Sequence, residues 1–288
     1  MEGHSTLNHA SDHEPTSVTY RPVTKYVEHE ECSELKDAVA IEAPLEIRLN
    51  GKAWMVTMRS PGSDHDLAAG FLWSEKIIHH VSDILEIAHC ERGEAVESNI
   101  LNVFLRPGLP QEDQIDRRGG ISHGGCGLCG KTAMESIQKQ FPPILSEEGV
   151  DAPTICSLLD SMHSLQNAFM KTGGVHAAAL FDAHGQCLVL REDIGRHNAV
   201  DKVIGHHIRN SATHSRPPAV LAVSSRASFE IVQKSISLGV PIIACASAPS
   251  SLAVDLAQAF NQTLVGFLRE GRFNVYTHPS RILTRPLK

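Results

Sequence analysis

Short apolar strands alternate with amphipathic helices through the carboxyl-terminal half of the chain, and this alternation constrains the fold more than any other feature. Two strand segments, Ala219–Val223 and Pro241–Cys245, contain only apolar residues. A strand of this kind is buried on both faces, so both faces of its sheet must be covered. The pattern therefore predicts an α/β fold, a three-layer αβα sandwich built on a mixed or parallel sheet. The expected strands are 175–181, 187–190, 219–223, 240–245, 263–268 and 273–276, and the expected helices are 197–209, 228–238 and 250–260.

The amino-terminal part of the chain has an α+β pattern instead. Alternating apolar residues flank Asn50-Gly51, which is typical of a β-hairpin. Asp64 is a candidate N-cap for the amphipathic helix that follows. Strands are expected over 84–88 and 100–105, and helices over 131–140 and 154–170. The expected organisation is a disordered polar tail over 1–30, a smaller α+β region over 31–115, a mobile loop over 116–130 and an αβα domain over 131–288.

Composition excludes several classes of protein. The net charge of −7 argues against general nucleic-acid binding, which depends on clustered Lys and Arg. No apolar run approaches the roughly 18 residues needed to cross a bilayer, and the first residues lack the pattern of a secretory signal. Five of the seven cysteines are dispersed singly, which fits buried thiols in a reducing compartment. We therefore expect a cytoplasmic protein that binds neither nucleic acid nor membrane.

A glycine-rich loop over 119–130 contains the two remaining cysteines, Cys126 and Cys129. Six of its twelve residues are glycine, so the thiols are reachable and the backbone is free to move. A Cys-x-x-Cys pair can form a redox disulfide, supply half of a zinc site, or present a nucleophilic thiol with a helper. The N-terminus of the helix expected from Lys131 would favour a thiolate, and His123 is a candidate proton acceptor.

A zinc deaminase is one alternative, because those enzymes combine His-x-Glu with Pro-Cys-x-x-Cys. The chain contains His89-Cys90-Glu91, 37 residues before Cys126. However, Gly125 stands where the proline is expected. His89 and Glu91 also fit the polar end of a strand, which is the more ordinary interpretation.

Three strand-to-helix turns carry polar and basic residues, at 191–198, 224–226 and 246–251. If the strands are parallel, the turns meet at one edge of the sheet, where α/β proteins bind ligands. Helix N-termini bind anions, and arginine side chains suit phosphates. The pattern predicts a phosphate-bearing ligand, to which the backbone at 172–174 would also come close. Plain helix capping explains each turn taken singly.

Three motifs together resemble the formate dehydrogenase accessory sulfurtransferases, the FdhD family. The motifs are Gly-Gly-Cys-Gly-Leu-Cys-Gly at 124–130, Thr-Gly-Gly-Val-His-Ala-Ala at 172–178, and Arg-Glu-Asp-Ile-Gly-Arg-His-Asn-Ala-Val-Asp-Lys at 191–202. The resemblance implies a cytoplasmic sulfurtransferase with a cytidine-deaminase-like fold. Such a protein accepts sulfur as a cysteine persulfide from a cysteine desulfurase and passes it to the molybdenum cofactor of formate dehydrogenase.

The resemblance also implies roles for particular residues. Cys126 would carry the persulfide, with Cys129 as its partner. The bound substrate would be the bis(molybdopterin guanine dinucleotide) molybdenum cofactor, and the protein would hold no metal tightly itself. A homodimer is compatible with this interpretation. The residues expected to bind the cofactor are Thr172, Gly173, Gly174, Arg191, Asp193, Gly195, Arg196, His197, Asn198, Ser224, Ser225, Arg226, Gly266, Phe267, Leu268, Arg269, Glu270 and Gly271. A zinc-dependent nucleobase or nucleoside deaminase and a non-catalytic cofactor-binding chaperone are the alternative functions.

Overall fold

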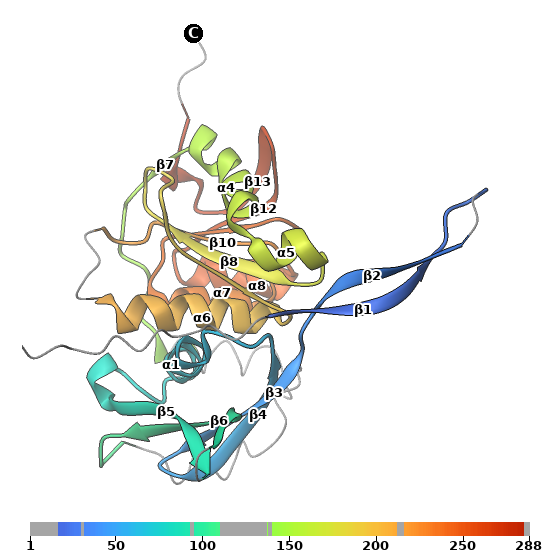
Figure 1. Cartoon of the computed structure of the whole chain (residues 1–288). Helices are drawn as coiled ribbons and strands as arrows, with labels where there is room; N and C mark the ends of the chain where they lie inside the picture. The colour runs from blue at the N-terminus through green and yellow to red at the C-terminus, as the bar shows by residue number, and fades with distance from the viewer. Residues whose placement is uncertain are drawn as a thin grey trace, which may run out of the picture.

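A six-stranded mixed sheet forms the centre of the molecule (Figure 1). The computed structural model describes residues 17–29, 32–92, 95–109, 137, 140–211 and 216–284. The strand order is β13-β12-β11-β10-β8-β9. The strands are β8 (His176–Phe181), β9 (Cys187–Asp193), β10 (Val220–Val223), β11 (Ile242–Cys245), β12 (Thr263–Arg269) and β13 (Arg272–Thr277). These bounds differ from the expected ones by no more than three residues at an end.

The side chains of each central strand divide between two hydrophobic cores, one on each face of the sheet. Leu221 and Ile243 face the core that contains α6 (Arg196–Arg209), α7 (Phe229–Leu238) and α8 (Ser251–Ala259). Their neighbours Val220 and Ile242 face the core that contains α4 (Ala152–Leu165). Helices thus cover both faces, as the all-apolar strands require. The mixed α/β class is confirmed, whereas the specific likeness to cytidine deaminases stays a prediction.

The amino-terminal region forms a four-stranded sheet, which packs on the core that contains α6, α7 and α8. Its order is β4-β3-β6-β5, with β3 (Ala43–Leu49), β4 (Lys52–Arg59), β5 (Ile84–Arg92) and β6 (Ala95–Leu105). Asn50 and Gly51 both have positive φ, so the predicted hairpin is confirmed with a type I′ turn. Four short elements also occur among the described residues: the paired strands β7 (Val150–Asp151) and β14 (Ile282–Leu283), and the 3₁₀ turns Val81–Asp83 and Pro279–Arg281.

Helix α1 (Asp64–Ser74) lies between the amino-terminal sheet and α6 (Figure 1). The two helices approach so closely that a Cβ built on Gly70 would lie 1.8 Å from the carbonyl oxygen of Asp201, and one on Gly205 would lie 1.8 Å from that of Asp66. Only glycine fits at these two positions. Asp64 is not the N-cap of α1: Ser63 precedes the helix, and the buried carboxylate of Asp64 forms a two-bond ion pair with Arg59, with N to O distances of 2.8 and 2.9 Å.

Two expectations about other segments are wrong. Residues 18–25 are not a disordered tail, because β1 (Val18–Lys25) pairs along its length with β2 (Ser33–Ala40). The helix expected over 154–170 is two helices, α4 and α5 (Asn167–Thr172), separated at Gln166. The helix expected over 131–140 falls mostly outside the described residues. Among the described helices, none has the length and apolar composition needed to cross a membrane.

Candidate functional site

The carboxyl ends of four strands meet at one edge of the central sheet. β10, β11 and β12 are parallel, and β8 runs antiparallel to both β9 and β10, so β9 points the same way as the other three. The turns that follow these strands are linked to each other: Ser250 N donates to Ala227 O at 3.0 Å, and Phe267 N donates to Ser247 O at 3.2 Å. The prediction that the three strand-to-helix turns share one edge is confirmed.

The turn after β10 presents one arginine to solvent. The hydroxyl of Ser224 accepts a hydrogen bond from Ala177 N at 3.0 Å, and that of Ser225 donates to Arg226 O at 3.1 Å. These two serines therefore shape the turn. Arg226 is exposed, and its guanidinium has no hydrogen bond or ion pair with another residue in the described part of the chain. Such a group is available for an anionic ligand.

The turn after β9 gathers ionisable side chains at the N-termini of α6 and α7. His197 Nε2 lies 2.9 Å from a carboxylate oxygen of Glu230, and the interaction with His197 lowers the pKa of Glu230. Half-buried His176, at the start of β8, has its pKa lowered by burial and by the charges of Arg196 and His197. Arg196 is half-buried and makes no hydrogen bond or ion pair within the described ranges. The positive guanidinium of Arg196 therefore lies near the imidazole of His176, whose lowered pKa favours the neutral form.

Behind this turn, Asp193 and Asn198 form a buried polar framework. The fully buried carboxylate of Asp193 lies 2.7 Å from Lys202 Nζ and accepts hydrogen bonds from the backbone N–H groups of Ser60 and Gly195. The amide of Asn198 donates to Met58 O at 2.7 Å. The polar groups of Asp193 and Asn198 thus have internal partners. They hold the turn in place for Arg196 and His197.

Arg191 is not brought to the edge of the sheet. Its guanidinium lies 3.1 Å from Asp66 Oδ2 and 2.7 Å from His206 Nδ1, at the junction of β9, α1 and α6. Arg209 pairs with the same carboxylate. A paired guanidinium in this position has little left to offer a phosphate. The motif residue Arg191 therefore contributes to packing between the two regions of the protein.

The Thr172–Gly174 segment ends α5 just before β8 enters the sheet at the same edge. Thr172 Oγ1 donates to Ala168 O at 2.8 Å and accepts from Gly174 N at 3.1 Å. Gly173 has a φ of 63°, which is the left-handed conformation common after a helix. The helix-cap interpretation therefore describes the local geometry, and the segment places His176 at the edge.

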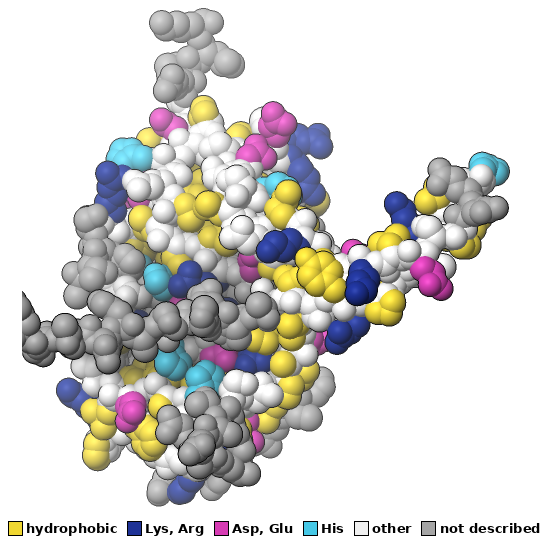
Figure 2. All heavy atoms as spheres, viewed as in Figure 1, with side chains coloured by type: hydrophobic (Ala, Val, Ile, Leu, Met, Phe, Trp, Pro, Cys, Tyr) yellow, Lys and Arg dark blue, Asp and Glu magenta, His cyan; other side chains and the backbone are white. Residues whose placement is uncertain are grey.

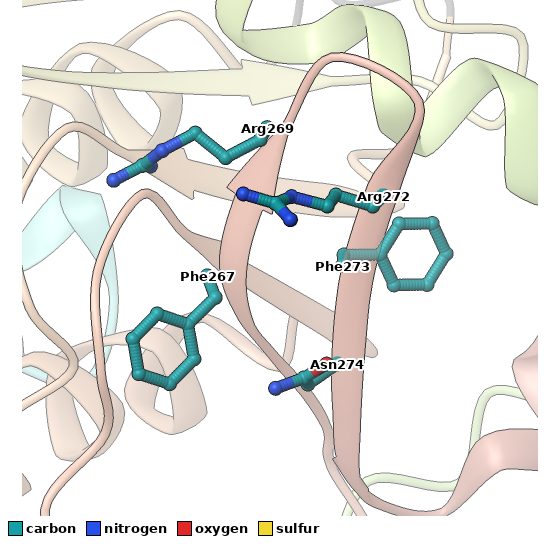
Figure 3. A pocket seen from close by; sticks show the side chains of 5 residues that line it. All are labelled: Phe267, Arg269, Arg272, Phe273 and Asn274. Atoms are coloured by element: carbon teal, nitrogen blue, oxygen red, sulfur yellow. The ribbon is translucent and has the colours of Figure 1, made fainter.

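A shallow pocket of about 380 Å³ lies where β12 and β13 meet the edge (Figure 3). Arg269 and Arg272 extend in the same direction as the ring of Phe267 (Figure 3). Phe267 has a φ of 52° and is 44% exposed, at an irregular point in the strand pairing. A non-glycine residue in this conformation is uncommon and marks a functional candidate. The residues that line the pocket are Phe267, Arg269, Arg272, Phe273 and Asn274.

Four other residues of the predicted 266–271 segment have structural roles: Gly266, Leu268, Glu270 and Gly271. Gly266 is packed so tightly that a Cβ would lie 2.9 Å from the ring of Tyr276 and 3.0 Å from Pro249. Leu268 is fully buried in the second core. Glu270 and Gly271 form the turn, where Gly271 has a φ of 70°. Arg269 donates to the carbonyl oxygens of Ala246 and Leu268.

Five residues at this edge were not among the predicted site residues: His176, Glu230, Arg272, Phe273 and Asn274. Arg272 directly follows the predicted segment, so extending that segment by one residue would have included it. Glu230 lies in the first turn of α7, where an acidic residue is ordinary, so its pairing with His197 had no signal in the sequence.

The predicted sulfur-chemistry residues Cys126 and Cys129, with His123, lie outside the described residues. The described cysteines are all free, but only Cys245 is buried, so the expectation of buried thiols holds for that residue alone. Burial raises the pKa of Cys245 far above its usual range, which keeps this thiol unreactive. Cys32, by contrast, is exposed.

Of the ligands that the zinc alternative requires, only His89 is among the described residues. His89 lies in β5, with Nε2 3.8 Å from Asp64 and its ring 5.7 Å from that of His65. It is therefore on a strand and not at the start of a helix. Within the described ranges, no group of three or more His, Cys, Asp or Glu residues is placed to hold a metal ion.

Comparison with known proteins gives one consistent family. The FdhD/NarQ family model matches residues 40–283. The sulfur carrier protein FdhD of Mycobacterium tuberculosis is 45% identical over 257 residues, which are 85% of this chain and 92% of the relative. The sulfur carrier protein FdhD of Anaeromyxobacter dehalogenans is 43% identical over 262 residues, covering 88% and 91% of the two chains.

A solved structure has the same fold. It is a crystal structure from Desulfotalea psychrophila, described as that of a formate dehydrogenase accessory protein, with a TM-score of 0.73 and 28% identity. The similarity covers 93% of this chain and 100% of the other. The family model that matches residues 40–283 and the 45% and 43% identity to two FdhD proteins agree with this structural similarity. This chain belongs to the FdhD/NarQ family.

Proposed function

We propose that this protein is a sulfur carrier that serves the maturation of formate dehydrogenase, with the molybdenum cofactor as its substrate. The relatives named as sulfur carrier proteins and the neighbour described as a formate dehydrogenase accessory protein support the general role. The observation that carries the proposal is the basic edge, which we define as Arg196, Arg226, Arg269 and Arg272. These side chains lie where the strand ends and helix N-termini of the central sheet meet.

The basic edge fits the chemistry of a bis(molybdopterin guanine dinucleotide). Each half of that molecule contains a pyrophosphate, which unpaired guanidinium groups such as those of Arg196 and Arg226 would bind. The exposed ring of Phe267 offers a flat surface on which guanine would stack, and the amide of Asn274 supplies a donor and an acceptor. Arg269 and Arg272 border the same pocket, so the charge and the aromatic surface are adjacent.

Sulfur would enter the protein at Cys126. The Cys126 thiolate attacks the outer sulfur of a desulfurase persulfide, the sulfur–sulfur bond of that persulfide breaks, and the desulfurase cysteine leaves as a thiolate. The product is a persulfide on Cys126. The cofactor would then act as an electron-pair donor toward the outer sulfur, so that the sulfur–sulfur bond of this persulfide breaks and Cys126 leaves as a thiolate. Cys129 would assist this transfer as the neighbouring thiol.

The direct test is mass spectrometry of the protein after incubation with a cysteine desulfurase and cysteine. We expect one added sulfur atom on the peptide that contains Cys126 and no labelling of Cys126→Ala. The control Cys32→Ala, which removes the exposed cysteine directly before β2, should be labelled normally. Undiminished labelling of Cys126→Ala would refute the assignment. If a Cys126→Ala/Cys129→Ala variant still activated formate dehydrogenase, the protein would act as a cofactor-binding chaperone instead.

A further inference from the structure

Glu192, a residue of the 191–202 motif, contacts a different part of the protein from its two neighbours. Arg191 and Asp193 bond to α1 and α6 on one face of the central sheet. Successive side chains of a strand point to opposite faces, and the Glu192 side chain accordingly reaches α5 on the other face. Three consecutive residues of β9 therefore connect the sheet to helices on both of its faces.

The carboxylate of Glu192 caps the N-terminus of α5. Its two oxygens accept hydrogen bonds from Ala168 N and Phe169 N, each at 2.8 Å. Gln166, which precedes the helix, makes no capping hydrogen bond with its side chain. The N–H groups of a first helical turn need acceptors, and the helix dipole favours a negative charge there. The cap of α5 therefore comes from a strand residue 24 positions from Ala168 along the chain.

The position of α5 depends on this cap because the helix has little other support. It contains six residues, and a helix of that length is not stable by itself in water. Only Ala168 among its residues is buried. The helix also contacts the base of the two-stranded ribbon of β1 and β2, which extends away from the body of the protein (Figures 1 and 2). The two hydrogen bonds to Glu192 therefore join α5 directly to the central sheet.

The segment 168–177 is held at both ends by Glu192. The side chain of Glu192 bonds to the start of this segment at Ala168, and its backbone lies opposite Ala177 in the register of β8 and β9. Between these two points the chain passes through the Thr172–Gly174 segment and His176, which reach the edge of the sheet where the basic edge lies. Loss of the side-chain bonds would release one end of this segment.

We propose that Glu192 is a positioning residue for the ligand of the basic edge, and that it acts through α5. With the cap in place, the backbone of Thr172–Gly174 and the imidazole of His176 are held at the edge near Arg196. The proposal rests on the proposed function, because that function supplies the ligand.

Titration of His176 by NMR tests the positioning in the full-length protein without any ligand. Burial and the charges of Arg196 and His197 lower the pKa of His176 and outweigh the opposing charge of Asp193. Glu192→Ala removes both hydrogen bonds to α5, so the imidazole should gain water and its pKa should rise toward the ordinary value of 6.5. Glu192→Gln keeps one acceptor oxygen and should give a smaller rise. His176→Gln identifies the resonance.

Calorimetry with guanosine diphosphate, a probe for one half of the cofactor, tests the consequence for binding. The affinity of Glu192→Ala should be about fivefold lower than that of the wild type, because the ligand must then order the segment 168–177 when it binds. Glu192→Gln should lie between the two. Glu46→Ala is the matched control: Glu46 is also a part-buried carboxylate in a strand, and it pairs with Arg48 at 2.6 Å in the amino-terminal sheet. This variant should match the wild type in both measurements.

Two results would overturn the proposal. The first is a folded Glu192→Ala protein in which His176 titrates as in the wild type, since a purely structural contact would lower stability without moving this pKa. The second is wild-type affinity for guanosine diphosphate in both Glu192 variants. Circular dichroism checks folding, and if Glu192→Ala does not fold, the same two measurements on Glu192→Gln decide. A wild type that binds no guanosine diphosphate would refute the proposed ligand site instead, and the titration of His176 would still decide the role of Glu192.

Discussion

Replacing Gly205 with alanine gives the sharpest test of how α1 and α6 are packed. In a helix without close neighbours, a change from glycine to alanine stabilises by about 0.5–1 kcal/mol, because glycine has more conformational freedom to lose on folding. At Gly205 the structure predicts the opposite sign. The new Cβ would lie 1.8 Å from the carbonyl oxygen of Asp66 and 2.7 Å from Gly70 N, both backbone atoms of α1.

The magnitude follows from this distance. To reach an ordinary contact of 3.4 Å, the two helices must move apart by about 1.6 Å. Overpacking of this kind typically costs about 1–3 kcal/mol, and a rigid backbone neighbour favours the upper end of that range. The shift would also disturb the Asp66 carboxylate, which lies beside Arg191 and Arg209. We expect Gly205→Ala to lower the free energy of unfolding by about 3 kcal/mol.

Urea denaturation followed by circular dichroism measures this change directly. Gly174→Ala is the control, because its φ is not positive and the nearest atom to its new Cβ is 3.6 Å away. The control should unfold within about 0.5 kcal/mol of the wild type. A Gly205→Ala protein as stable as the wild type, or more stable, would refute the close approach of the two helices.

Two further predictions concern charge. Arg226→Ala should weaken the binding of guanosine diphosphate, a probe for one half of the cofactor, by about tenfold, because a charge-assisted hydrogen bond is lost. Calorimetry measures this affinity, and Arg21→Ala in β1 is the control. Equal affinity of the two variants would contradict the role of Arg226. Burial opposes ionisation of Asp66, but the hydrogen bond with His206 and the charges of Arg191 and Arg209 outweigh burial and hold its pKa below the usual value. A lowered carboxyl pKa stabilises the fold above the unfolded-state pKa of 3.8, and this contribution is lost as the pH falls through the folded-state value. Wild-type stability should therefore drop in that acidic range more steeply than that of Asp66→Asn, as measured by urea denaturation at a series of pH values; parallel curves would show that Asp66 is not responsible.

The central sheet was predictable because its physical signal is strong. Ala219–Val223 and Pro241–Cys245 could be buried only inside a layered sheet, and that requirement fixed both the helices on each face and the edge where the turns meet. Strand β1 was missed because its side chains are exposed or half-buried, so no apolar period exists to be read. The break between α4 and α5 at Gln166 was missed because no glycine or proline lies there to indicate the end of a helix.

The location of the candidate site was predictable from the sequence, but which of its residues are available to bind a ligand was not. Arg191 and Arg196 look equivalent in the sequence, yet Arg191 pairs with Asp66, which is 125 positions away along the chain. A pairing over that separation depends on how α1 packs against β9. Likewise, the acceptor role of Asp193 depends on Ser60 and Lys202, which come from different elements. Motifs locate such residues, whereas tertiary contacts decide which of them remain available to a ligand.

The buried contacts of Asp193 have a consequence for how the basic edge responds to a ligand. Ser60, which directly follows β4, donates its backbone N–H to Asp193 and accepts from the ammonium of Lys202, so the amino-terminal sheet is bonded to the turn that presents Arg196. A movement of one region against the other would break these bonds between buried groups, at a cost in free energy. The edge is therefore preorganised, and a ligand that docks there loses little free energy to rearranging the protein.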